Sequence, residues 1–316
     1  MADDRLPEEF ALIRRYFAPL AAHPGAAGLA DDVALLAPGA GLVHVFKTDT
    51  IVEGVHYLPN DPADQVARKL LRVNLSDLAA KGARPVGYLL AASFSRATRE
   101  SWLATFVSGL AADQKEFGFS LLGGDTTATP GPTTLSVTAI GEAEEAKVPR
   151  RGGAKLGDDI FVTGTLGDAA LGLRVLKGTL KVAGGEHLVA RFRVPEPRLA
   201  LGMKIAVVAS ASIDVSDGLL ADLGHICEES HVGAEVERDR LPLSDPARAA
   251  VAADAASWSD IVAGGDDYEV LYTVPPGAPA VAGATRIGRI VAGAGVMLRD
   301  STGRVIEAKT AGYRHF

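Results

Sequence analysis

The chain has 316 residues, of which 47% are hydrophobic and 22% charged, and its formal net charge is −7. This balance is typical of a globular protein long enough for two domains, and the acidic charge argues against a nucleic-acid partner. The single cysteine, Cys227, excludes an intramolecular disulfide and a cysteine-based zinc site, and we expect it to be a buried apolar side chain. The sequence contains neither an apolar secretory signal nor a long apolar run, so we expect a cytoplasmic protein without a transmembrane helix.

Hydrophobic periodicity predicts helices and strands in irregular alternation over the N-terminal half of the chain. The expected helices span 7–21, 61–83 and 99–118. The expected strands span 33–38, 41–54, 85–95, 119–127 (a short strand running into a glycine turn) and 133–143. The stretch "KVPRRGGAKLGDD" is rich in glycine and basic residues. We place a domain boundary there, which gives domains 1–147 and 148–316.

The C-terminal half begins with a strand and a helix over 159–176, followed by two helices in 186–209 that Pro195 and Pro197 separate. A strand ends near Val215 and a helix follows it. A loop and a strand are expected over 256–275 and short strands over 284–291, 295–300 and 304–308. Because strands and helices alternate irregularly, the sequence predicts an α+β fold in both domains rather than a doubly wound sheet.

Acidic side chains recur among apolar residues at the apparent ends of these elements. In "SIDVSDGLLADLGHI", a helix N-cap explains Asp217 and a solvated helix face would suit Asp222. Neither explains Asp214, because an ionised carboxylate inside an apolar run needs a partner. Similar acids are Asp31, Asp32, Asp49, Asp77, Asp125, Asp266, Asp267 and Glu269. Each alone is compatible with a cap or a satisfied core group, whereas the whole set favours a shared function.

Hard oxygen ligands without cysteine suit Mg²⁺ or Ca²⁺, and glycines directly before an acid, as in "GGD", free backbone N–H groups for phosphate oxygens. Arg150 and Arg151 fit a phosphate clamp and a solvated linker equally well. The sequence contains no P-loop, no protein-kinase motif set, no "GxSxG" and no "HExxH". The residues alone therefore predict a magnesium-dependent enzyme that handles phosphates in a carboxylate-rich site assembled from two domains.

The motifs "NLSDLAAKGA", "GGDTT" and "DVSDGLLADLGHI", in this order, resemble the thiamine-monophosphate kinases of the aminoimidazole-ribonucleotide synthetase-like superfamily, and the resemblance runs nearly end to end. It implies direct in-line transfer of a phosphoryl group from ATP to thiamine monophosphate, which gives thiamine diphosphate and ADP. It also implies several Mg²⁺ ions held by aspartates between the domains, and no general base. Two N-terminal domains of such proteins pair their sheets into a barrel-like homodimer.

The same resemblance implies roles for individual residues. The implied metal ligands are Asp32, Thr48, Asp49, Asp77, Asp125, Asp214 and Asp217. The implied ATP contacts are Gly124, Asp125, Arg151 and Ser216. The implied contacts to thiamine monophosphate are His56, Asp266 and Tyr313.

The sequence departs from the family pattern in three regions. Lys47 stands where relatives often carry a serine or threonine that serves a metal, and Asp266 stands where they carry glutamate. Before the closing "GY", where many relatives have an aromatic residue that stacks on thiamine, this chain has Thr310 and Ala311. Tyr313 or Phe316 would have to substitute for that aromatic.

Two alternatives remain open. The first is another ATP-using synthetase of the same superfamily. Selenophosphate synthetase-like enzymes need an N-terminal cysteine or selenocysteine and hydrogenase-maturation relatives a C-terminal cysteine, and this chain has neither. The second is a non-catalytic nucleotide- or metal-binding protein that has kept the fold. Turnover of ATP, as opposed to binding alone, separates this second alternative from an enzyme.

Overall fold

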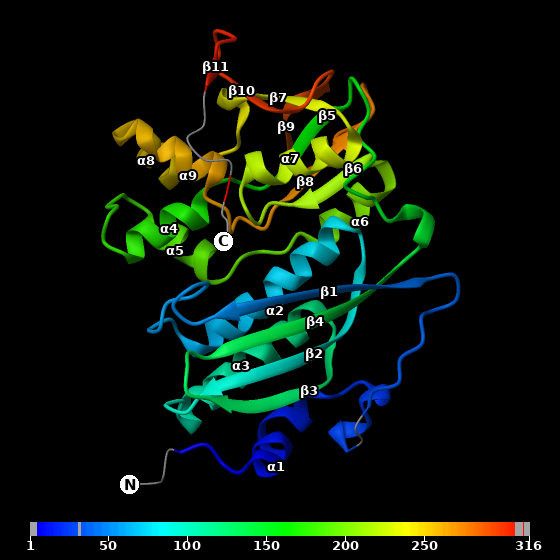
Figure 1. Cartoon of the computed structure of the whole chain (residues 1–316), viewed down its shortest axis with the longest axis vertical. Helices are drawn as coiled ribbons and strands as arrows, with labels where there is room; N and C mark the ends of the chain where they lie inside the picture. The colour runs from blue at the N-terminus through cyan, green and yellow to red at the C-terminus, as the bar shows by residue number, and fades with distance from the viewer. Residues whose placement is uncertain (1–4, 31–32, 307–311, 313–316) are drawn as a thin grey trace. The chain divides into compact units, whose positions relative to one another are not determined.

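The structure is a computed structural model that describes residues 5–30, 33–306 and 312 (Figure 1). The chain forms two compact units, one of residues 1–78 and 84–145 and one of residues 79–83 and 146–316. Each unit contains one β-sheet and several helices, so the predicted α+β fold is confirmed. In the described part of the chain, no helix is long and apolar enough to cross a membrane.

The first unit is built on a four-stranded sheet with the order β1-β4-β2-β3 (Figure 1). The pairs β1–β4 and β2–β4 are antiparallel, whereas β2 and β3 are parallel. The edge strands are therefore β1 and β3. The strands are β1 (Val43–Val52), β2 (Arg84–Ser95), β3 (Ser120–Thr129) and β4 (Thr134–Ala143).

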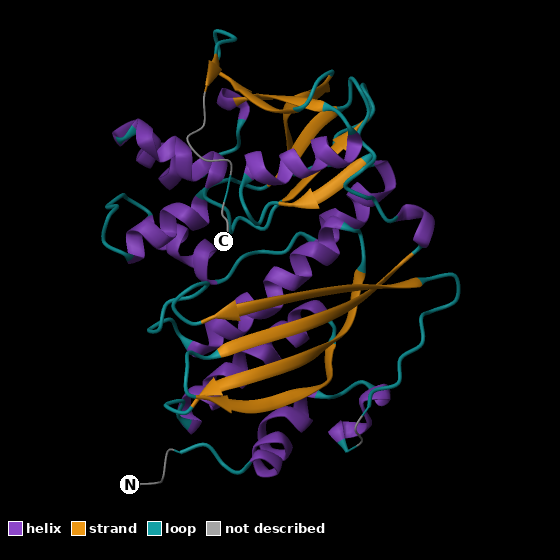
Figure 2. Ribbon diagram, viewed as in Figure 1, coloured by secondary structure: helices purple, strands orange, loops and turns teal. Residues whose placement is uncertain are grey.

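Helices α2 (Ala63–Ala80) and α3 (Glu100–Phe117) cover one face of this sheet (Figure 2). Successive strand side chains alternate between the two faces, and on the covered face Phe94 packs its ring against Trp102 and Phe106 of α3. The opposite face carries exposed apolar side chains, with Phe46 65% and Leu89 38% exposed. The N-terminal helical segments are α1 (Glu9–Leu12), η1 (Ile13–Phe17), η2 (Ala18–Leu20) and η3 (Pro24–Leu29).

The second unit is built on a seven-stranded sheet with the order β11-β10-β7-β9-β5-β8-β6, in which only β7 and β10 are parallel. Strand β6 forms one edge. The strands are β5 (Asp159–Thr163), β6 (Ala211–Asp214), β7 (Gly233–Glu237), β8 (Val270–Val274), β9 (Ala284–Val291), β10 (Gly295–Arg299) and β11 (Val305–Ile306).

Both faces of this sheet are covered. Side chains from α4, α5, α7, α8 and α9 complete the larger core, in which Cys227 is buried as expected and burial raises the pKa of its thiol to about 11. Phe161 and Tyr272 stack on the other face in a core shared with α6. The helices are α4 (Asp168–Leu176), α5 (Gly185–Arg193), α6 (Leu199–Val208), α7 (Leu219–Ser230), α8 (Asp245–Ala253) and α9 (Trp258–Ala263). Short 3₁₀ turns are η4 (Glu145–Lys147), η5 (Arg238–Arg240) and η6 (Ala255–Ser257).

Several predicted elements were wrong in detail. Residues 33–38 form no strand, because an apolar run this short does not by itself specify one. Strand β3 continues through Gly123 and Gly124 instead of turning there, since its pairing with β2 extends to Thr129. A side chain at Gly124 would start 1.9 Å from the carbonyl oxygen of Leu90, so only glycine fits this approach. The short helix α9 replaces part of a predicted loop.

Candidate active site

Two of the predicted metal ligands meet in the first unit. Asp49 lies on β1 and Asp77 on α2, and the ammonium group of Lys47 contacts both. Its Nζ is 3.1 Å from Asp49 Oδ1 and 2.9 Å from Asp77 Oδ2. Lys47 and Asp49 are two residues apart on a strand and therefore point to the same face, which α2 covers. The carboxylates thus converge on one cation.

Thr48 lies between these residues on β1 and faces the other side of the sheet. Its hydroxyl donates to the carbonyl of Val137 at 3.1 Å and accepts from the hydroxyl of Thr138 at 3.2 Å. The structure therefore does not bring this hydroxyl to the Asp49–Asp77 pair.

Gly124 and Asp125 lie on β3, at the opposite edge of the sheet from β1. Asp125 is in register with Ala91 of β2 and its side chain is exposed. Three strand spacings of about 4.8 Å separate the two edges, so Asp125 lies about 14 Å across the sheet from β1 of its own chain.

His56 lies in the turn that follows β1, and two contacts fix its position. Its Nδ1 accepts a hydrogen bond from the backbone N–H of Val52 at 3.0 Å, and the buried Lys69 donates to its carbonyl oxygen at 2.9 Å. Because Nδ1 is an acceptor, the neutral imidazole carries its proton on Nε2. In this tautomer the ring is a hydrogen-bond donor at Nε2.

In the second unit, Asp214 ends the edge strand β6 and is buried, and the loop containing Ser216 and Asp217 follows it. Oδ2 of Asp222 accepts hydrogen bonds from the backbone N–H groups of Ser216, Asp217 and Gly218 at 3.0, 3.0 and 3.1 Å. The loop is thus fixed by an acid from the helix that comes after it.

The structure rules out the interpretation of Asp217 as a helix N-cap and of Asp222 as a solvated side chain. Asp222 is buried rather than solvated, because its carboxylate turns back to accept the N–H groups before the helix. Gly218, not Asp217, is the N-cap of α7. Burial raises the pKa of Asp222 from 3.8 to about 7, and the negative charge of Asp217 acts in the same direction, while the three backbone donors oppose the shift.

The "GGDD" loop packs directly on this segment. The backbone N–H of Asp266 donates to Ser216 O at 2.8 Å, and that of Tyr268 donates to Val215 O at 2.8 Å. Asp266 has a φ of 61°, and its Oδ1 accepts from the hydroxyl of Tyr268 at 3.0 Å. At Gly265, with a φ of 71°, a Cβ would lie 2.5 Å from Ser216 O, so glycine is required. Asp266, Ser216 and Asp217 are therefore held together.

A buried ion cluster supports this loop. Glu269 accepts from Arg198 at 2.7 and 2.6 Å, from Arg191 at 3.0 Å and from the hydroxyl of Thr163 at 2.7 Å. Arg191 also donates to the carbonyl of Asp267, whose carboxyl is buried against the N–H of Gly167. Desolvation raises the pKa of Asp267 well above its usual value. These arginines were not anticipated, although the acids of "GGDDYEV" signalled the need for cationic partners.

The loop containing Arg151 runs beside β6. The backbone N–H of Ser212 donates to Arg150 O at 3.0 Å, and the Ser230 hydroxyl donates to Arg151 O at 3.2 Å. The Arg151 side chain is exposed. This arginine therefore belongs to the same unit as Asp214, on a loop that β6 and the end of α7 hold in place.

Two predicted site residues, Asp32 and Tyr313, lie outside the described residues. Gly312, next to Tyr313 in the chain, is described. A Cβ at Gly312 would lie 2.5 Å from the Cβ of Ala221 and 2.7 Å from the carbonyl oxygen of Asp217. The chain therefore passes directly against the Asp217 loop at Gly312.

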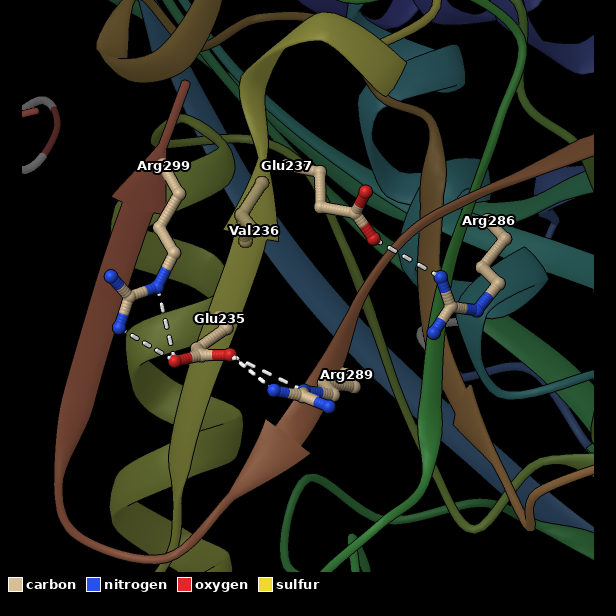
Figure 3. A pocket seen from close by; sticks show the side chains of 6 residues that line it. All are labelled: Glu235, Val236, Glu237, Arg286, Arg289 and Arg299. Carbon is tan, nitrogen blue, oxygen red and sulfur yellow. Dashed lines mark hydrogen bonds and ion pairs between the residues drawn. The ribbon is translucent and has the colours of Figure 1, made fainter. Parts of the chain in front are cut away.

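A small cavity of about 160 Å³ lies elsewhere in the second unit (Figure 3). It is lined by Glu235, Val236, Glu237, Arg286, Arg289 and Arg299. Arg289 and Arg299 both pair with Glu235 and lower its pKa, while Arg286 pairs with Glu237 and with Asp159. Each of the three arginines thus pairs with at least one acid, and the lining of the cavity contains none of the predicted site residues.

The predicted metal ligands offer oxygen atoms, which are the ligands that a hard divalent ion such as Mg²⁺ prefers. Among the described residues, no three His, Cys, Asp or Glu side chains gather closely enough to hold a metal by themselves. Mg²⁺, however, commonly keeps several waters and bridges one or two carboxylates to substrate phosphates. Asp49 and Asp77 already converge on one positive charge. A pair of this kind meets the requirement of Mg²⁺ for oxygen ligands.

Comparison with known proteins shows to which family the chain belongs. Residues 30–143 match the family described as "AIR synthase related protein, N-terminal domain". The chain is 42% identical to the thiamine-monophosphate kinase of Caulobacter vibrioides over 98% of this chain and 91% of that protein.

Two solved structures share the fold. The thiamine-monophosphate kinase of Stenotrophomonas maltophilia has a TM-score of 0.82 at 40% identity, over 95% of this chain and 98% of that one. A structure described as "AaThiL complexed with AMPPCP and TMP" has a TM-score of 0.80 at 30% identity, over 90% of this chain and 91% of that one. The chain therefore belongs to the thiamine-monophosphate kinase family, a family of enzymes.

Proposed function

We propose that this protein transfers the γ-phosphoryl group of ATP directly to the phosphate of thiamine monophosphate and releases thiamine diphosphate and ADP. The observation that carries the proposal is the convergence of Asp49 and Asp77 on one cation in a chain of this family. A fold neighbour described as a complex with "AMPPCP and TMP" supports the two substrates.

The reaction brings two phosphate anions together, and several Mg²⁺ ions bound to carboxylates would neutralise this charge and align the in-line attack. Asp49, Asp77 and Asp214 are the ligands with the clearest structural support, since the first two converge and the third ends a buried strand. The further proposed ligands are Asp32, Asp125 and Asp217. The hydroxyl of Thr48 bonds to Val137 and Thr138 on the other face of the sheet, so we do not propose it as a ligand beside Asp49 and Asp77.

The acceptor is a phosphate monoester whose second pKa is about 6, so near neutral pH its oxygens are already ionised and need no base. His56 supports this account, because its Nδ1 accepts the Val52 N–H and its Nε2 carries the proton of the neutral ring. We assign His56 the role of donating a hydrogen bond to thiamine monophosphate.

Nucleotide contacts are proposed at Gly124, Asp125, Arg151 and Ser216. Gly124 and Asp125 are neighbours on β3, and the loop of Ser216, which comes directly before α7, is fixed by Asp222. Asp266 and Tyr313 are proposed contacts of thiamine monophosphate. The packing of Asp266 against Ser216, and of Gly312 against Asp217, supports both.

We propose a homodimer that pairs the first sheets of two chains, and the two edge strands of this sheet support it. Because β1 and β3 are its two edge strands, pairing of two such sheets places β1 of one chain beside β3 of the other. Asp125 of one chain would then complete the site that contains Asp49 of its partner. The exposed Phe46 and Leu89 would be covered in such a barrel. The cytoplasm as the location of the protein stays a prediction.

The proposal is tested by incubating the purified protein with ATP, Mg²⁺ and thiamine monophosphate and separating the products by chromatography. Thiamine diphosphate and ADP should form in equal amounts and only when all three components are present. Binding of ATP without turnover would instead support a non-catalytic nucleotide-binding protein.

A further inference from the structure

Lys47 places its ammonium group between the carboxylates of Asp49 and Asp77. Its Nζ contacts one oxygen of each carboxylate, at 3.1 and 2.9 Å. The three side chains are 30%, 34% and 21% exposed, so water screens the cluster only in part. The regular geometry of β1 and α2 fixes the arrangement, because all three residues lie inside these elements and not in loops.

The ammonium group of Lys47 and a divalent ion would compete for the carboxylates of Asp49 and Asp77. Mg²⁺ binds oxygens at about 2.0–2.1 Å, whereas an ammonium contacts them at nearly 3 Å, so both cannot use the same two oxygens. Repulsion between the positive charges acts in the same direction. The ammonium is tethered to β1, so its charge is present at any Mg²⁺ concentration.

We propose that Lys47 is a built-in cation that replaces one divalent ion at the Asp49–Asp77 pair, so that this chain binds one ion fewer than it would with a neutral residue at position 47. The proposal rests on the proposed function, since it assumes that the pair belongs to the metal-dependent site. The second oxygen of each carboxylate is the atom through which the pair would bind the remaining metal. Lys47 is thereby a positioning residue that sets the spacing of two ligands.

Counting bound ions tests the proposal directly. The full-length protein is titrated with Mn²⁺ in the presence of a non-hydrolysable ATP analogue, and free Mn²⁺ is measured by electron paramagnetic resonance. Lys47→Met removes the charge and keeps the length of the side chain. We expect it to bind about one more Mn²⁺ per chain than the wild type. Lys115→Met, on the exposed surface of α3, is the matched control and should keep the wild-type count.

A second measurement reports on the unliganded cluster. In EDTA, Lys47→Met should unfold at a lower temperature than the wild type, because two carboxylates lose their common partner. Mn²⁺ should raise its Tm more than it raises that of the wild type. If the variant folds only with Mn²⁺, the proposal is supported, and if Mn²⁺ does not restore folding, the proposal is contradicted. Lys47→Arg keeps the charge and should retain the wild-type count.

An equal Mn²⁺ count in the wild type and Lys47→Met would overturn the proposal, since it would mean that Lys47 gives way when metal binds. This outcome is distinguishable from failure of the proposed function. The number of Mn²⁺ ions bound per chain does not depend on turnover. Absence of thiamine diphosphate would therefore contradict the proposed kinase activity and leave the role of Lys47 to be decided by the ion counts. If the enzyme is active and the wild type and Lys47→Met bind equal numbers of Mn²⁺ ions, only the proposed role of Lys47 is contradicted.

Discussion

Asp49 and Asp125 lie on the two opposite edge strands of one four-stranded sheet. Two further strands separate them, so a single chain holds them about 14 Å apart. If both serve the same metal cluster, as we propose, each site takes Asp49 from one chain and Asp125 from the other.

Mixed dimers test this arrangement. Asp49→Asn and Asp125→Asn should each inactivate the enzyme, because an amide does not carry the charge that a divalent ion requires. After the two inactive variants are unfolded and refolded together, about half of the dimers should be mixed, and each mixed dimer should contain one unaltered site. Activity should return to about a quarter of the wild-type value. No recovery, with mixed dimers verified by mass spectrometry, would place both residues of a site on one chain.

Asp77→Asn should lower kcat by about a hundredfold or more while the protein stays folded. The side chain is partly exposed and contacts Lys47, so the loss of its charge affects metal binding more than packing. Steady-state kinetics over a range of Mg²⁺ concentrations and the far-UV circular dichroism spectrum measure the two effects. Asp64→Asn, in the first turn of the same helix, is the control and should keep wild-type kinetics. Wild-type turnover of Asp77→Asn at low Mg²⁺ would exclude a metal-binding role.

His56→Asn should raise KM for thiamine monophosphate by about tenfold and change kcat much less. The asparagine oxygen can still accept the N–H of Val52, as Nδ1 does, but the donor at Nε2 is lost. The pH profile of kcat should keep its shape. A fall in kcat of about a thousandfold, with KM unchanged and the acidic limb of the profile lost, would identify His56 as a general base instead.

Asp222→Ala should lower the free energy of unfolding by about 1–3 kcal/mol, because three backbone N–H groups lose their acceptor. Urea unfolding measures the change, and KM for ATP should rise as the loop of Ser216 loosens. Asp222→Asn keeps one oxygen and should lose less. Asp245→Ala, an exposed acid in the first turn of α8, is the control. Equal losses in Asp222→Ala and Asp245→Ala would show that the three hydrogen bonds do not hold the loop.

Local sequence patterns predicted many of the helices and strands correctly. The apolar spacing of 61–83 and 99–118 gave α2 and α3 to within a few residues, and Gly82 and Gly118 follow the two helices as stop signals do. The prediction for strand β3 was wrong because two glycines in a row are typical of a turn, whereas here Gly124 allows a close backbone approach to β2. Whether the two glycines form a turn or continue the strand depends on pairing with β2, which hydrophobic periodicity does not reveal.

The candidate site was predictable as a set of acids but not as an arrangement. Motif order predicts Asp49 and Asp77 as candidate ligands, whereas their shared contact with Lys47 depends on how α2 lies on β1. The helix pattern is compatible with a solvated Asp222, because such a pattern cannot show a carboxylate that turns back on the preceding loop. The pairing of Glu269 with Arg198 joins residues 71 positions apart, a separation beyond local sequence signals.

A comparison of two acceptors tests the central claim, that the acceptor group is a phosphate. The purified protein is given ATP and Mg²⁺ with either thiamine monophosphate or thiamine, and kcat/KM is measured for each. Thiamine lacks the charge that the metal-bound carboxylates are arranged to hold, and its hydroxyl would need a base. We predict that thiamine monophosphate is preferred by at least about a hundredfold, with thiamine diphosphate as the product. Comparable rates with thiamine, or no reaction with thiamine monophosphate, would contradict the account.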